Sequence, residues 1–493
     1  MQLEKLLRAT AVRQVIGSLD REVESVAYDS RRVQSNSVFV ALRGEKVDGH
    51  QFVGQAIERG ASVIVTDREE KHPRATCAVV ENTRTALADI AAAFYRRPAE
   101  RLKIAGVTGT NGKTTTTFLI KHICEQAGLR CGLVGTVRYE IGERILPATR
   151  TTPESLDLQE LLAAIVNAGC RAAAMEVSSH ALAQDRVRGI EWDVAVFTNL
   201  TQDHLDFHGT MENYFEAKAR LFTQLSTQQK KRKAVAIVNV DDRYGAQLLE
   251  KIDDRVGVIT YGSGLRADFR ASNYRAEFSG TSYQLEARGR SYLVRVPLIG
   301  RFNVANSMAA LAAANSLGVD LRQAIASLAK SPQIPGRLEA VPAKRQFQVF
   351  VDYAHTPDAL LNVVKTLREL EPRRLLVVFG CGGNRDRQKR PLMAEVVDRN
   401  ADYAVITSDN PRKEDPAAIV DEVEKGFRSN HYEKIVDRTE AINRAVELAR
   451  PRDIVLIAGK GHETYQEFAD RTIPFDDIQV ARRAIENHPV TFQ

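Results

Sequence analysis

The chain has 493 residues, of which 44% are hydrophobic and 27% are charged. This composition is ordinary for a soluble globular protein of about three domains, so cores can form without disulfide or metal support. The net charge of +6 (69 Lys and Arg against 63 Asp and Glu) is a mild excess that favours anionic small substrates over nucleic acid.

Cysteine usage and hydropathy predict a cytoplasmic protein that is neither secreted nor inserted in a membrane. The five cysteines are odd in number and include no C-x-x-C pair, so neither a disulfide framework nor a zinc site is expected. The N-terminus lacks the apolar core of a signal peptide, and no run approaches the ~20 apolar residues that span a bilayer.

Residues 1–99 predict a small mixed α/β domain. Apolar runs at 38–42 and 61–66 predict short strands, and 86–95 predicts a helix that ends before Pro98.

Residues 100–334 predict a central domain with a parallel sheet and flanking helices, of the type found in P-loop ATPases. A helix is predicted at 114–127, and Thr152 is a candidate N-cap of a second helix with Pro153 at its first position. Alternating patterns then predict an antiparallel hairpin from 281 to 297 and a helix at 303–317. Four apolar runs predict buried strands: 103–107, 172–177, 193–198 and 234–240.

Residues 335–493 predict a C-terminal Rossmann-like α/β domain. The segment 331–336 holds two prolines and a glycine, which predicts a linker in front of it. The strands of this domain are predicted at 347–351, 375–379, 403–407 and 454–458.

A glycine-rich turn joins the strand at 103–107 to the following helix, as in a phosphate-binding loop. Backbone N–H groups of such a turn close around phosphate oxygens, and the helix N-terminus adds a favourable dipole. Lys113 is the candidate for neutralising the β- and γ-phosphates, and the Thr114 hydroxyl is a candidate Mg²⁺ ligand. The candidate nucleotide-binding residues are Gly109, Thr110, Asn111, Gly112, Lys113, Thr114 and Thr115.

Two features qualify this interpretation of the loop. Val107 stands where the general phosphate-loop pattern has its first glycine, although the shorter form G-x-x-G-K-T is intact. No Asn-Lys-x-Asp guanine motif occurs, so ATP is favoured over GTP. The alternative is a purely structural strand–turn–helix, but Lys113 would have no packing role there.

Four further motifs follow in order, and with the phosphate loop they resemble those of the Mur ligases. They are MEVSSH at 175–180, TQDHLD at 201–206, DYAHTP at 352–357 and DNPR at 409–412. The resemblance covers nearly the whole chain, from Asp29 to Glu463. It implies that ATP phosphorylates a substrate carboxylate and that an amine then attacks the acyl phosphate to form an amide.

Within that family, the motifs resemble the members that act in peptidoglycan biosynthesis with meso-diaminopimelate. The implied acceptor is the D-glutamate side-chain carboxylate of UDP-N-acetylmuramoyl-L-alanyl-D-glutamate. The implied partners are therefore these small molecules and ATP with Mg²⁺, with no nucleic acid and no membrane, and a monomer is the default expectation.

The resemblance implies a catalytic and metal-binding group in the central domain. Glu176, at the end of an apolar strand, suits a hard cation, and His204 resembles a ligand of a second metal. Lys218 is implied to carry a CO₂-derived carbamate that helps to hold this metal. The catalytic candidates are Lys113, Glu176, His204 and Lys218, and the metal candidates are Thr114, Glu176, His204 and Lys218.

Each of these residues also has an ordinary structural interpretation. Glu176 alone would be a solvated carboxylate at a strand end, and His204 a hydrogen-bonded loop histidine. Lys218 alone would be a surface lysine on an amphipathic helix at 213–222.

Contacts to the sugar-peptide substrate are implied in the first two domains. Arg186 is suited to grip a carboxylate or a phosphate with its planar fork. The candidates for the sugar-peptide are Thr151, Thr152, Ser178, Gln184 and Arg186. In the first domain, Tyr28, Asp29 and Ser30 resemble the family's contacts to the uridine diphosphate.

Recognition of the amino acid is implied in the third domain. Diaminopimelate differs from lysine by one carboxylate, so rejecting lysine requires a cation that would otherwise stay unpaired. Arg412 fits this role, and the resemblance implies that lysine-adding members lack it; the alternative for 409–412 is an ordinary type I turn. The other candidates are Arg385, Asp409, Asn410, Pro411, Gly459 and Glu463.

Contacts to the adenosine of ATP are implied around the linker, with Gly336 as a possible hinge for domain closure. The candidates are Asn303, Arg337, Asp352, Tyr353 and His355.

Two other functions stay open on the sequence. A folylpolyglutamate-synthetase-like ligase shares the loop and the chemistry, but it lacks the first 99 residues and the 409–412 motif. A P-loop switch or nucleic-acid-binding ATPase is supported only by the charge of +6.

Overall fold

The computed structural model describes residues 1–44, 47–228, 233–342 and 345–488. The chain divides into two compact units. The first unit comprises Met1–Tyr261 and Ala309–Ala324, and the second comprises Gly262–Met308 and Ile325–Gln493. Helices α10 (Arg301–Ser316) and α11 (Leu321–Leu328) each run from one unit into the other. The division into three domains, with boundaries at 99 and 334, stays a prediction.

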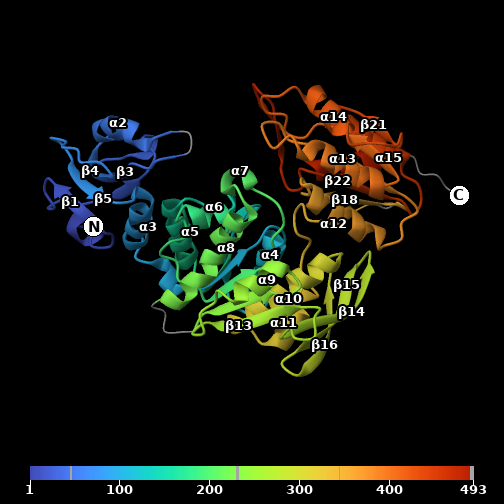
Figure 1. Ribbon diagram of the computed structural model, residues 1–493, viewed down its shortest axis with the longest axis horizontal. Helices are drawn as coiled ribbons and strands as arrows, with labels where there is room; N and C mark the ends of the chain where they lie inside the picture. The colour runs from blue at the N-terminus through green and yellow to red at the C-terminus, as the bar shows by residue number, and fades with distance from the viewer. Residues whose placement is uncertain (45–46, 229–232, 343–344, 489–493) are drawn as a thin grey trace. The chain divides into compact units, whose positions relative to one another are not determined.

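A five-stranded sheet in the order β1-β5-β4-β3-β2 begins the first unit. Its strands are β1 (Val12–Ile16), β2 (Ser25–Ala27), β3 (Ser37–Val40), β4 (Ala61–Thr66) and β5 (Thr76–Val80). Side chains of β3 alternate between two cores: Val38 packs with α1 (Leu3–Leu7) and α3 (Thr83–Phe94), and Phe39 packs with α2 (Val53–Glu58). Figure 1 shows the sheet between α2 and α3.

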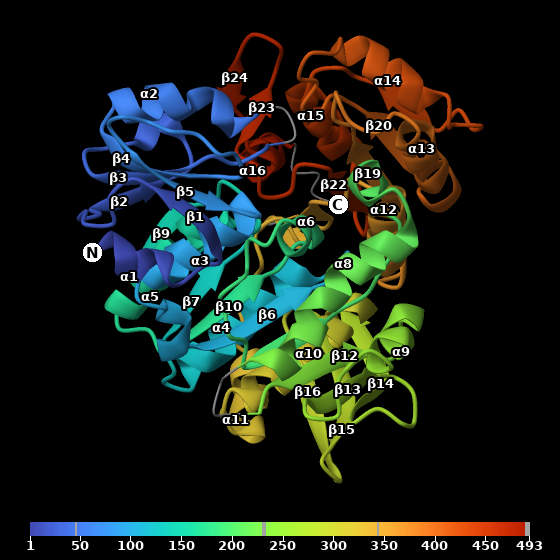
Figure 2. The same cartoon turned by 60° about the vertical axis from the view of Figure 1, so that its left-hand side comes forward.

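The main sheet of the first unit has the order β13-β12-β11-β6-β10-β7-β8-β9. The strands from β13 to β7 are parallel, and β8 and β9 form an antiparallel edge. Helix α4 (Lys113–Gln126) lies along β6 and β10 (Figure 2). The strands are β6 (Lys103–Thr108), β7 (Cys131–Val134), β8 (Arg138–Ile141), β9 (Arg144–Pro147), β10 (Ala172–Glu176), β11 (Val194–Phe197), β12 (Val235–Asn239) and β13 (Gly257–Gly262).

The helices of this unit connect the parallel strands, which confirms the predicted α/β alternation. Strand β6 contains Gly106, where a Cβ atom would lie 2.6 Å from the ring of Trp192, so the bare backbone makes room for this fully buried side chain. The helices are α5 (Ser155–Asn167), α6 (Ser179–Ala183), α7 (Leu205–His208), α8 (Met211–Thr223) and α9 (Arg243–Leu249).

The start of α5 corrects one prediction. Thr152 is not the N-cap; α5 begins at Ser155, and Glu154 occupies the cap position. The Thr152 hydroxyl instead donates to the carbonyl of Glu176 (2.8 Å) and accepts from the amide of Ser178 (3.0 Å). These backbone groups lie at the last residue of β10 and two residues beyond it, and they take up the hydroxyl in place of the helix terminus.

The second unit contains an antiparallel hairpin region and a mostly parallel sheet. The predicted hairpin is present as β15 (Gly280–Ala287) and β16 (Arg290–Val296), extended by β14 (Phe269–Glu277). The parallel sheet has the order β17-β18-β22-β19-β20-β21, with β17 antiparallel at one edge. Its strands are β17 (Glu339–Ala340), β18 (Gln348–Asp352), β19 (Leu375–Phe379), β20 (Tyr403–Ile406), β21 (Tyr432–Lys434) and β22 (Ile454–Ala458).

Helices cover both faces of this sheet, as expected for a Rossmann-like domain. One core packs α12 (Pro357–Arg368), α13 (Lys389–Asn400) and α14 (Pro416–Glu424), and a second packs α15 (Arg438–Leu448) and α16 (Asp477–Asn487). A small hairpin, β23 (Tyr465–Glu467) and β24 (Thr472–Pro474), follows β22. The carboxyl ends of β18, β19, β20 and β22 therefore meet at one edge, where ligands of such sheets bind.

All five cysteines are buried, and their thiols are free. Burial raises the pKa of the Cys381 thiol to about 12. Among the described helices, none combines the length and the apolar character needed to cross a membrane.

Candidate active site

The predicted phosphate loop joins β6 to α4 in the first unit, and its glycines are required by the backbone. Gly109 has φ +146°, and a Cβ atom there would lie 1.9 Å from Oγ1 of Thr198. Gly112 has φ +85° and occupies the N-cap position of α4. Since α4 starts at Lys113, the amides of Thr114 and Thr115 lie in the positive first turn of a 14-residue helix.

The loop is braced by the segment after β11. The amide of Thr110 donates to the carbonyl of Asn199, and the amide of Asn111 donates to the Asn199 side chain (both 2.9 Å). The hydroxyl of Thr110 donates to the carbonyl of Thr201 (3.2 Å). These bonds fix the loop conformation, so little reorganisation is needed to receive an anion.

Two lysines donate to the same loop carbonyl. Nζ of Lys113 lies 2.9 Å from the carbonyl oxygen of Gly109 and 2.8 Å from that of Thr110. Nζ of Lys218, on α8, lies 2.8 Å from the Gly109 oxygen. The sequence did not indicate this convergence, because the two lysines are more than a hundred residues apart.

Lys218 is 2% exposed, so the interpretation as a surface lysine is wrong. Burial, and then the charge of Lys113, hold the pKa of Lys218 well below its ordinary value. The neutral amine is therefore favoured, and only the neutral form is nucleophilic.

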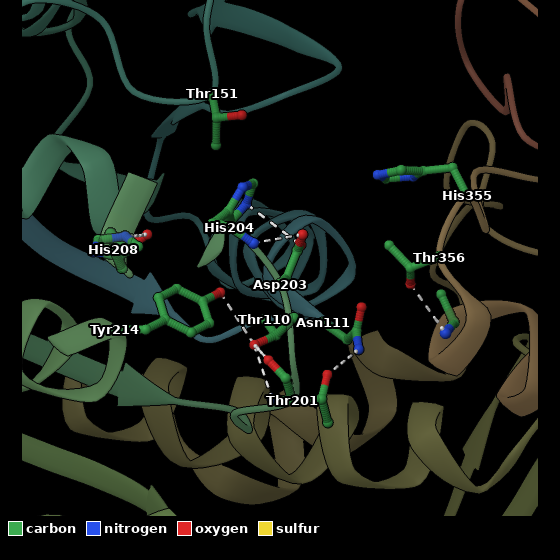
Figure 3. Close-up of polar contacts among 12 residues, drawn as sticks. Thr110, Asn111, Thr151, Thr201, Asp203, His204, His208, Tyr214, His355 and Thr356 are labelled. Carbon is green, nitrogen blue, oxygen red and sulfur yellow. Dashed lines mark hydrogen bonds and ion pairs between the residues drawn. The ribbon is translucent and has the colours of Figure 1, made fainter. Parts of the chain in front are cut away.

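Tyr214, which the sequence did not single out, links Lys218 to the loop. The Lys218 Nζ lies 4.6 Å from the centre of the Tyr214 ring. The Tyr214 hydroxyl lies 3.2 Å from Oγ1 of Thr110 (Figure 3). Figure 3 also shows that His204 lies over the same loop, beside Asp203.

Glu176 ends β10, the strand next to β6 in the sheet. Its carboxylate accepts from the amide (2.8 Å) and the hydroxyl (2.9 Å) of Thr136, and the side chain is buried. A Cβ atom on Gly135 would lie 2.4 Å from Oε1 of Glu176, so this glycine makes room for the carboxylate. The interpretation as a solvated carboxylate is wrong, and Thr136 also reaches Thr151 (3.0 Å between hydroxyl oxygens).

His204 precedes α7 with φ +53°, and its Nε2 lies 3.4 Å from the Asp203 carboxylate. Partial burial, followed by the charges of His180 and Lys113, lowers the pKa of His204 below its usual value. Water limits this shift, since 45% of the side chain is exposed. The neutral imidazole that a metal needs is nevertheless favoured at pH 7.

The donors in this region fit Mg²⁺ only in part. The Thr114 hydroxyl and the buried Glu176 carboxylate are oxygen donors of the preferred kind. Within the described residues, no three His, Cys, Asp or Glu side chains gather into a metal site of their own. This is the arrangement expected when phosphate oxygens and water supply the remaining ligands.

Arg186 is held inside the protein rather than pointing freely at a ligand. It donates to the Thr152 carbonyl (3.2 Å) and to the Gln184 side chain (2.6 Å), and its Nε lies 3.5 Å from the Glu154 carboxylate. The hydroxyl of Ser178 accepts from the amide of Ala181 and caps α6. These residues lie together, and protein groups engage most of their polar atoms. The exception is the buried Nε of Arg186, which lies at ion-pair distance from Glu154 but makes no hydrogen bond within the part of the chain that the structure describes.

In the N-terminal sheet region, the predicted uridine-side residues also have protein partners. The Tyr28 hydroxyl donates to the Asp157 carboxylate (2.5 Å), and burial followed by this bond raises the pKa of the phenol. The Ser30 hydroxyl donates to the Gln55 side chain (2.6 Å).

In the second unit, the predicted adenosine-side residues surround the end of β18. Both oxygens of the buried Asp352 accept backbone amides, from Leu338 (2.6 Å) and Ala354 (2.8 Å). The Arg337 guanidinium lies 4.9 Å from the centre of the Tyr353 ring, and Nδ1 of His355 lies 2.8 Å from the Tyr353 carbonyl oxygen.

The adenosine-side candidate Asn303 and the hinge candidate Gly336 each make a tight contact inside the protein. The side chain of Asn303 donates to the Ile299 carbonyl (2.9 Å) within the turn that starts α10. Gly336 has φ +64°, and a Cβ atom there would lie 2.2 Å from the amide nitrogen of His462. A role of Gly336 as a hinge stays a prediction.

The loop 409–412 follows β20 and has an unusual backbone. Arg412 has φ +53°, and its Nη1 donates to the Gly383 carbonyl (2.9 Å). A Cβ atom on Gly383 would lie 1.9 Å from the Pro411 oxygen, so the glycine pair after β19 leaves room for the loop. Arg385 is exposed, and its hydrogen bond within the described chain goes to the Asn384 carbonyl (3.4 Å).

The loop after β22 contacts the loop 409–412 through a cluster of polar side chains. Asn410 donates to the Glu463 carboxylate (2.8 Å), and the fully buried Lys460 donates to both Asn410 (3.0 Å) and Glu463 (3.1 Å). Gly459 has φ +118°, and a Cβ atom there would lie 2.6 Å from Oδ2 of Asp409. The structure therefore brings the candidates Asp409, Asn410, Gly459 and Glu463 together and adds Lys460.

Comparison with known proteins agrees with this geometry. Three family models match the chain: the Mur ligase family catalytic domain (residues 22–95), the Mur ligase middle domain (107–314) and the Mur ligase glutamate ligase domain (336–461).

Two curated relatives have the name UDP-N-acetylmuramoyl-L-alanyl-D-glutamate--2,6-diaminopimelate ligase. The one from Geobacillus kaustophilus is 47% identical over 468 residues, which are 94% of this chain and 95% of that protein. The one from Caldanaerobacter subterraneus subsp. tengcongensis is 42% identical over 488 residues, which are 98% and 99% of the two chains.

Solved structures agree as well. A UDP-N-acetylmuramoyl-L-alanyl-D-glutamate--2,6-diaminopimelate ligase superposes with a TM-score of 0.71 at 35% identity and covers 99% of both chains. A folylpolyglutamate synthase from Mycobacterium tuberculosis shares the fold, with a TM-score of 0.65 at 19% identity over 82% of this chain and 96% of that one. The chain belongs to the Mur ligase family, whose members are ATP-dependent ligases that form amide bonds.

Proposed function

We propose that this chain adds meso-diaminopimelate to the D-glutamate side-chain carboxylate of UDP-N-acetylmuramoyl-L-alanyl-D-glutamate, using ATP. The observation that carries the proposal is the pair of built sites, a braced phosphate loop in one unit and an arginine loop in the other. The full-length relatives with this activity in their names support the choice of substrates.

In the first step, a carboxylate oxygen of the D-glutamate attacks the γ-phosphorus of ATP, and ADP leaves. Both reactants are anions, so the chain must supply positive charge and oriented N–H groups. Lys113 would exchange its bonds to the loop carbonyls of Gly109 and Thr110 for the γ-phosphate. The first turn of α4 would face the β-phosphate.

Mg²⁺ would be held by the Thr114 hydroxyl and Glu176, with His204 toward a second ion, and would supply charge neutralisation when bound. Lys218 is proposed to react with CO₂ and become a carbamate. Its burial, its lowered pKa and its place beside the Gly109 carbonyl support this role, because a neutral amine is what CO₂ requires.

In the second step, the amine of diaminopimelate attacks the acyl carbon, loses a proton and displaces phosphate. Arg412 is proposed to pair with the distal carboxylate of the amino acid, and Glu463 with its distal ammonium. Asn410, held by Lys460, would orient Glu463. Asp409, Pro411 and Gly459 shape the loop, and the exposed Arg385 is available to a second carboxylate.

The proposal includes the remaining predicted contacts. Tyr28, Ser30, Thr151, Thr152, Ser178, Gln184 and Arg186 would meet the nucleotide-sugar dipeptide, and Asn303, Arg337, Asp352 and His355 would lie on the adenosine side. Because Arg186, Ser178 and Asp352 are engaged by protein groups, their roles would be partly to shape the site. A cytoplasmic monomer acting on small molecules completes the proposal.

Phosphate release with the UDP-linked dipeptide, comparing diaminopimelate with lysine, tests this function. We expect turnover with diaminopimelate and a preference of at least 100-fold over lysine, since a buried or half-buried charge pair is worth about 2–5 kcal/mol. In the Arg412→Ala variant, the KM for diaminopimelate should rise about 100-fold, and the KM for ATP should stay within about twofold.

Turnover with folate substrates in place of the nucleotide-sugar dipeptide would contradict the proposal in favour of a folylpolyglutamate-type ligase. Equal use of lysine and diaminopimelate, or unchanged kinetics in Arg412→Ala, would remove Arg412 from substrate selection. Salt-sensitive retention of nucleic acid would instead favour the ATPase alternative.

A further inference from the structure

Glu467, the last residue of β23, contacts the loop 409–412 through three of its own groups. Its carboxylate accepts from Nε of Arg412 (3.0 Å), and its carbonyl accepts from the Arg412 amide (3.0 Å). Its amide donates to Oδ1 of Asn410 (3.0 Å). One residue outside every recognised motif therefore touches two of the residues proposed to select the amino acid.

The guanidinium of Arg412 is fixed along two of its edges. Nε is held by Glu467 and Nη1 by the Gly383 carbonyl. Nη2 carries no hydrogen bond to any residue that the structure describes, and the Arg412 side chain is 22% exposed. The planar fork is therefore presented with one nitrogen open, in a direction that Glu467 and Gly383 set together.

The backbone conformation of Arg412 shows that contacts with its surroundings hold the residue in place. A non-glycine residue at φ +53° is strained by about 1 kcal/mol or more, and such strain persists only where other contacts determine the conformation. The Glu467 carbonyl supplies one of these contacts by holding the Arg412 amide. The side chain of Glu467 then orients the guanidinium on that strained backbone.

The charge of Glu467 has a second effect. Its side chain is 43% exposed, so it lies at the open side of the loop and places a negative charge next to the cation that receives the substrate carboxylate. The carboxylate thus positions Arg412 and at the same time weakens its attraction for anions in general. A neutral group of the same shape would keep the first effect and lose the second.

We propose that Glu467 is a positioning and specificity-determining residue, which aims Arg412 so that an amino acid with a distal carboxylate is accepted and one without it is not. This inference rests on the proposed function of the chain. Lysine lacks the distal carboxylate and makes no use of the fork, so Glu467 acts on diaminopimelate alone.

Two variants separate the positioning effect of Glu467 from the effect of its negative charge. Glu467→Ala removes both and keeps the backbone bonds to Asn410 and Arg412; Glu467→Gln keeps an oxygen acceptor for Nε. In phosphate-release kinetics, Glu467→Ala should raise the KM for diaminopimelate about 10-fold, as for loss of a hydrogen bond to a charged group. The constants with lysine, the kcat with diaminopimelate and the KM for ATP should each stay within about twofold of the wild-type values. The preference for diaminopimelate over lysine therefore falls about 10-fold.

Glu467→Gln should have a KM for diaminopimelate equal to or below that of the wild type. In the Arg412→Ala background, Glu467→Ala should not raise the KM for diaminopimelate further, because the positioning effect of Glu467 acts through the Arg412 side chain. Glu433→Ala is the matched control, since Glu433 pairs with Arg444 at a similar exposure in the same unit, and it should leave all constants unchanged.

The inference is overturned if Glu467→Ala keeps the wild-type KM for diaminopimelate, or if its effect persists without Arg412. It is also overturned if both Glu467 variants lose activity alike with both amino acids and toward ATP, which would indicate a general structural role. A wild-type protein that does not use diaminopimelate would end the proposed function as well, and the wild-type assay distinguishes that failure from the others.

Discussion

The phosphate loop of the first unit and the arginine loop of the second are built alike but work in different surroundings. Both follow parallel strands at the carboxyl edge of a sheet, and both rely on glycines that let backbone and side chains approach closely. Lys218, behind the phosphate loop, is 2% exposed, whereas the side chain of Arg412 is 22% exposed.

The difference in burial changes what a cation can do. At the phosphate loop, burial and the neighbouring Lys113 favour the neutral form of Lys218, so the surroundings alter its chemistry. Arg412 stays charged in any protein environment, and its neighbours control only its direction. The comparison suggests that reactivity depends on exclusion of water in one unit and that selection depends on hydrogen-bond geometry in the other.

The largest effect that would break this comparison is expected at Lys113. Lys113→Ala removes the one loop cation that is proposed to leave its carbonyl contacts for the γ-phosphate. Turnover measured by phosphate release should fall about 1000-fold or more, as for loss of a preorganised donor at a developing charge. The melting temperature should stay near that of the wild type; retained turnover would exclude the loop from the chemistry.

Lys218→Met sharpens the comparison, because activity and stability should change in opposite directions. Turnover should fall at least about 100-fold, since the carbamate can no longer form. Between the lowered pKa of Lys218 and its ordinary value, the unfolded chain binds a proton that the folded chain does not. Stability therefore rises with pH through that window, and the buried amine costs stability at neutral pH.

Thermal denaturation of Lys218→Met should accordingly show a higher melting temperature at pH 7 and a flatter dependence on pH. Lys251→Met is the control, because Lys251 is an exposed lysine of the same unit that pairs with Glu216. A lower melting temperature in Lys218→Met would contradict the picture of a buried neutral amine.

A smaller effect is expected at His208, which lies against Tyr214 and bonds to Ser179 (2.9 Å). Burial, followed by the charge of His180, lowers the pKa of His208 to about 4. As the pH falls from about 6.5 toward 4, the unfolded state takes up a proton first, so the folded state loses stability.

His208→Gln should reduce this acid-induced loss by roughly 2 kcal/mol, measured by urea denaturation at pH 7 and pH 4.5. The exposed His431 provides the control variant, His431→Gln, which should follow the wild type. Equal acid sensitivity in His208→Gln and the wild type would show that burial in this region does not govern titration.

Sequence patterns predicted the elements of both regions well where the apolar signal is continuous. Strands β19 (Leu375–Phe379) and β22 (Ile454–Ala458) match their predicted ranges, because strands buried on both faces are unbroken apolar runs. The predicted N-cap at Thr152 was wrong, because backbone groups at the end of β10, far away in the sequence, compete for its hydroxyl and no local rule describes that competition.

Within the sites, motifs indicated residues, but tertiary placement determined their state. The sequence indicated Gly459 and Glu463 as candidates and passed over Lys460 between them, because the complete burial of Lys460 is visible only in the fold. The contact of Arg412 with Glu467 spans 55 residues and depends on where a short hairpin lies. Likewise, the helix around Lys218 was predicted from the sequence, but the burial of the helix face that carries Lys218 was not.

The five buried thiols have a practical consequence for labelling this protein with dyes. Because every native cysteine is shielded in the interior, a cysteine introduced on the surface should be the first to react with a maleimide dye. One such label on each unit would allow energy transfer between the dyes to be followed as ATP and the amino acid are added, without first replacing the native residues. The interior chemistry of this chain thus makes it a convenient subject for single-molecule measurements.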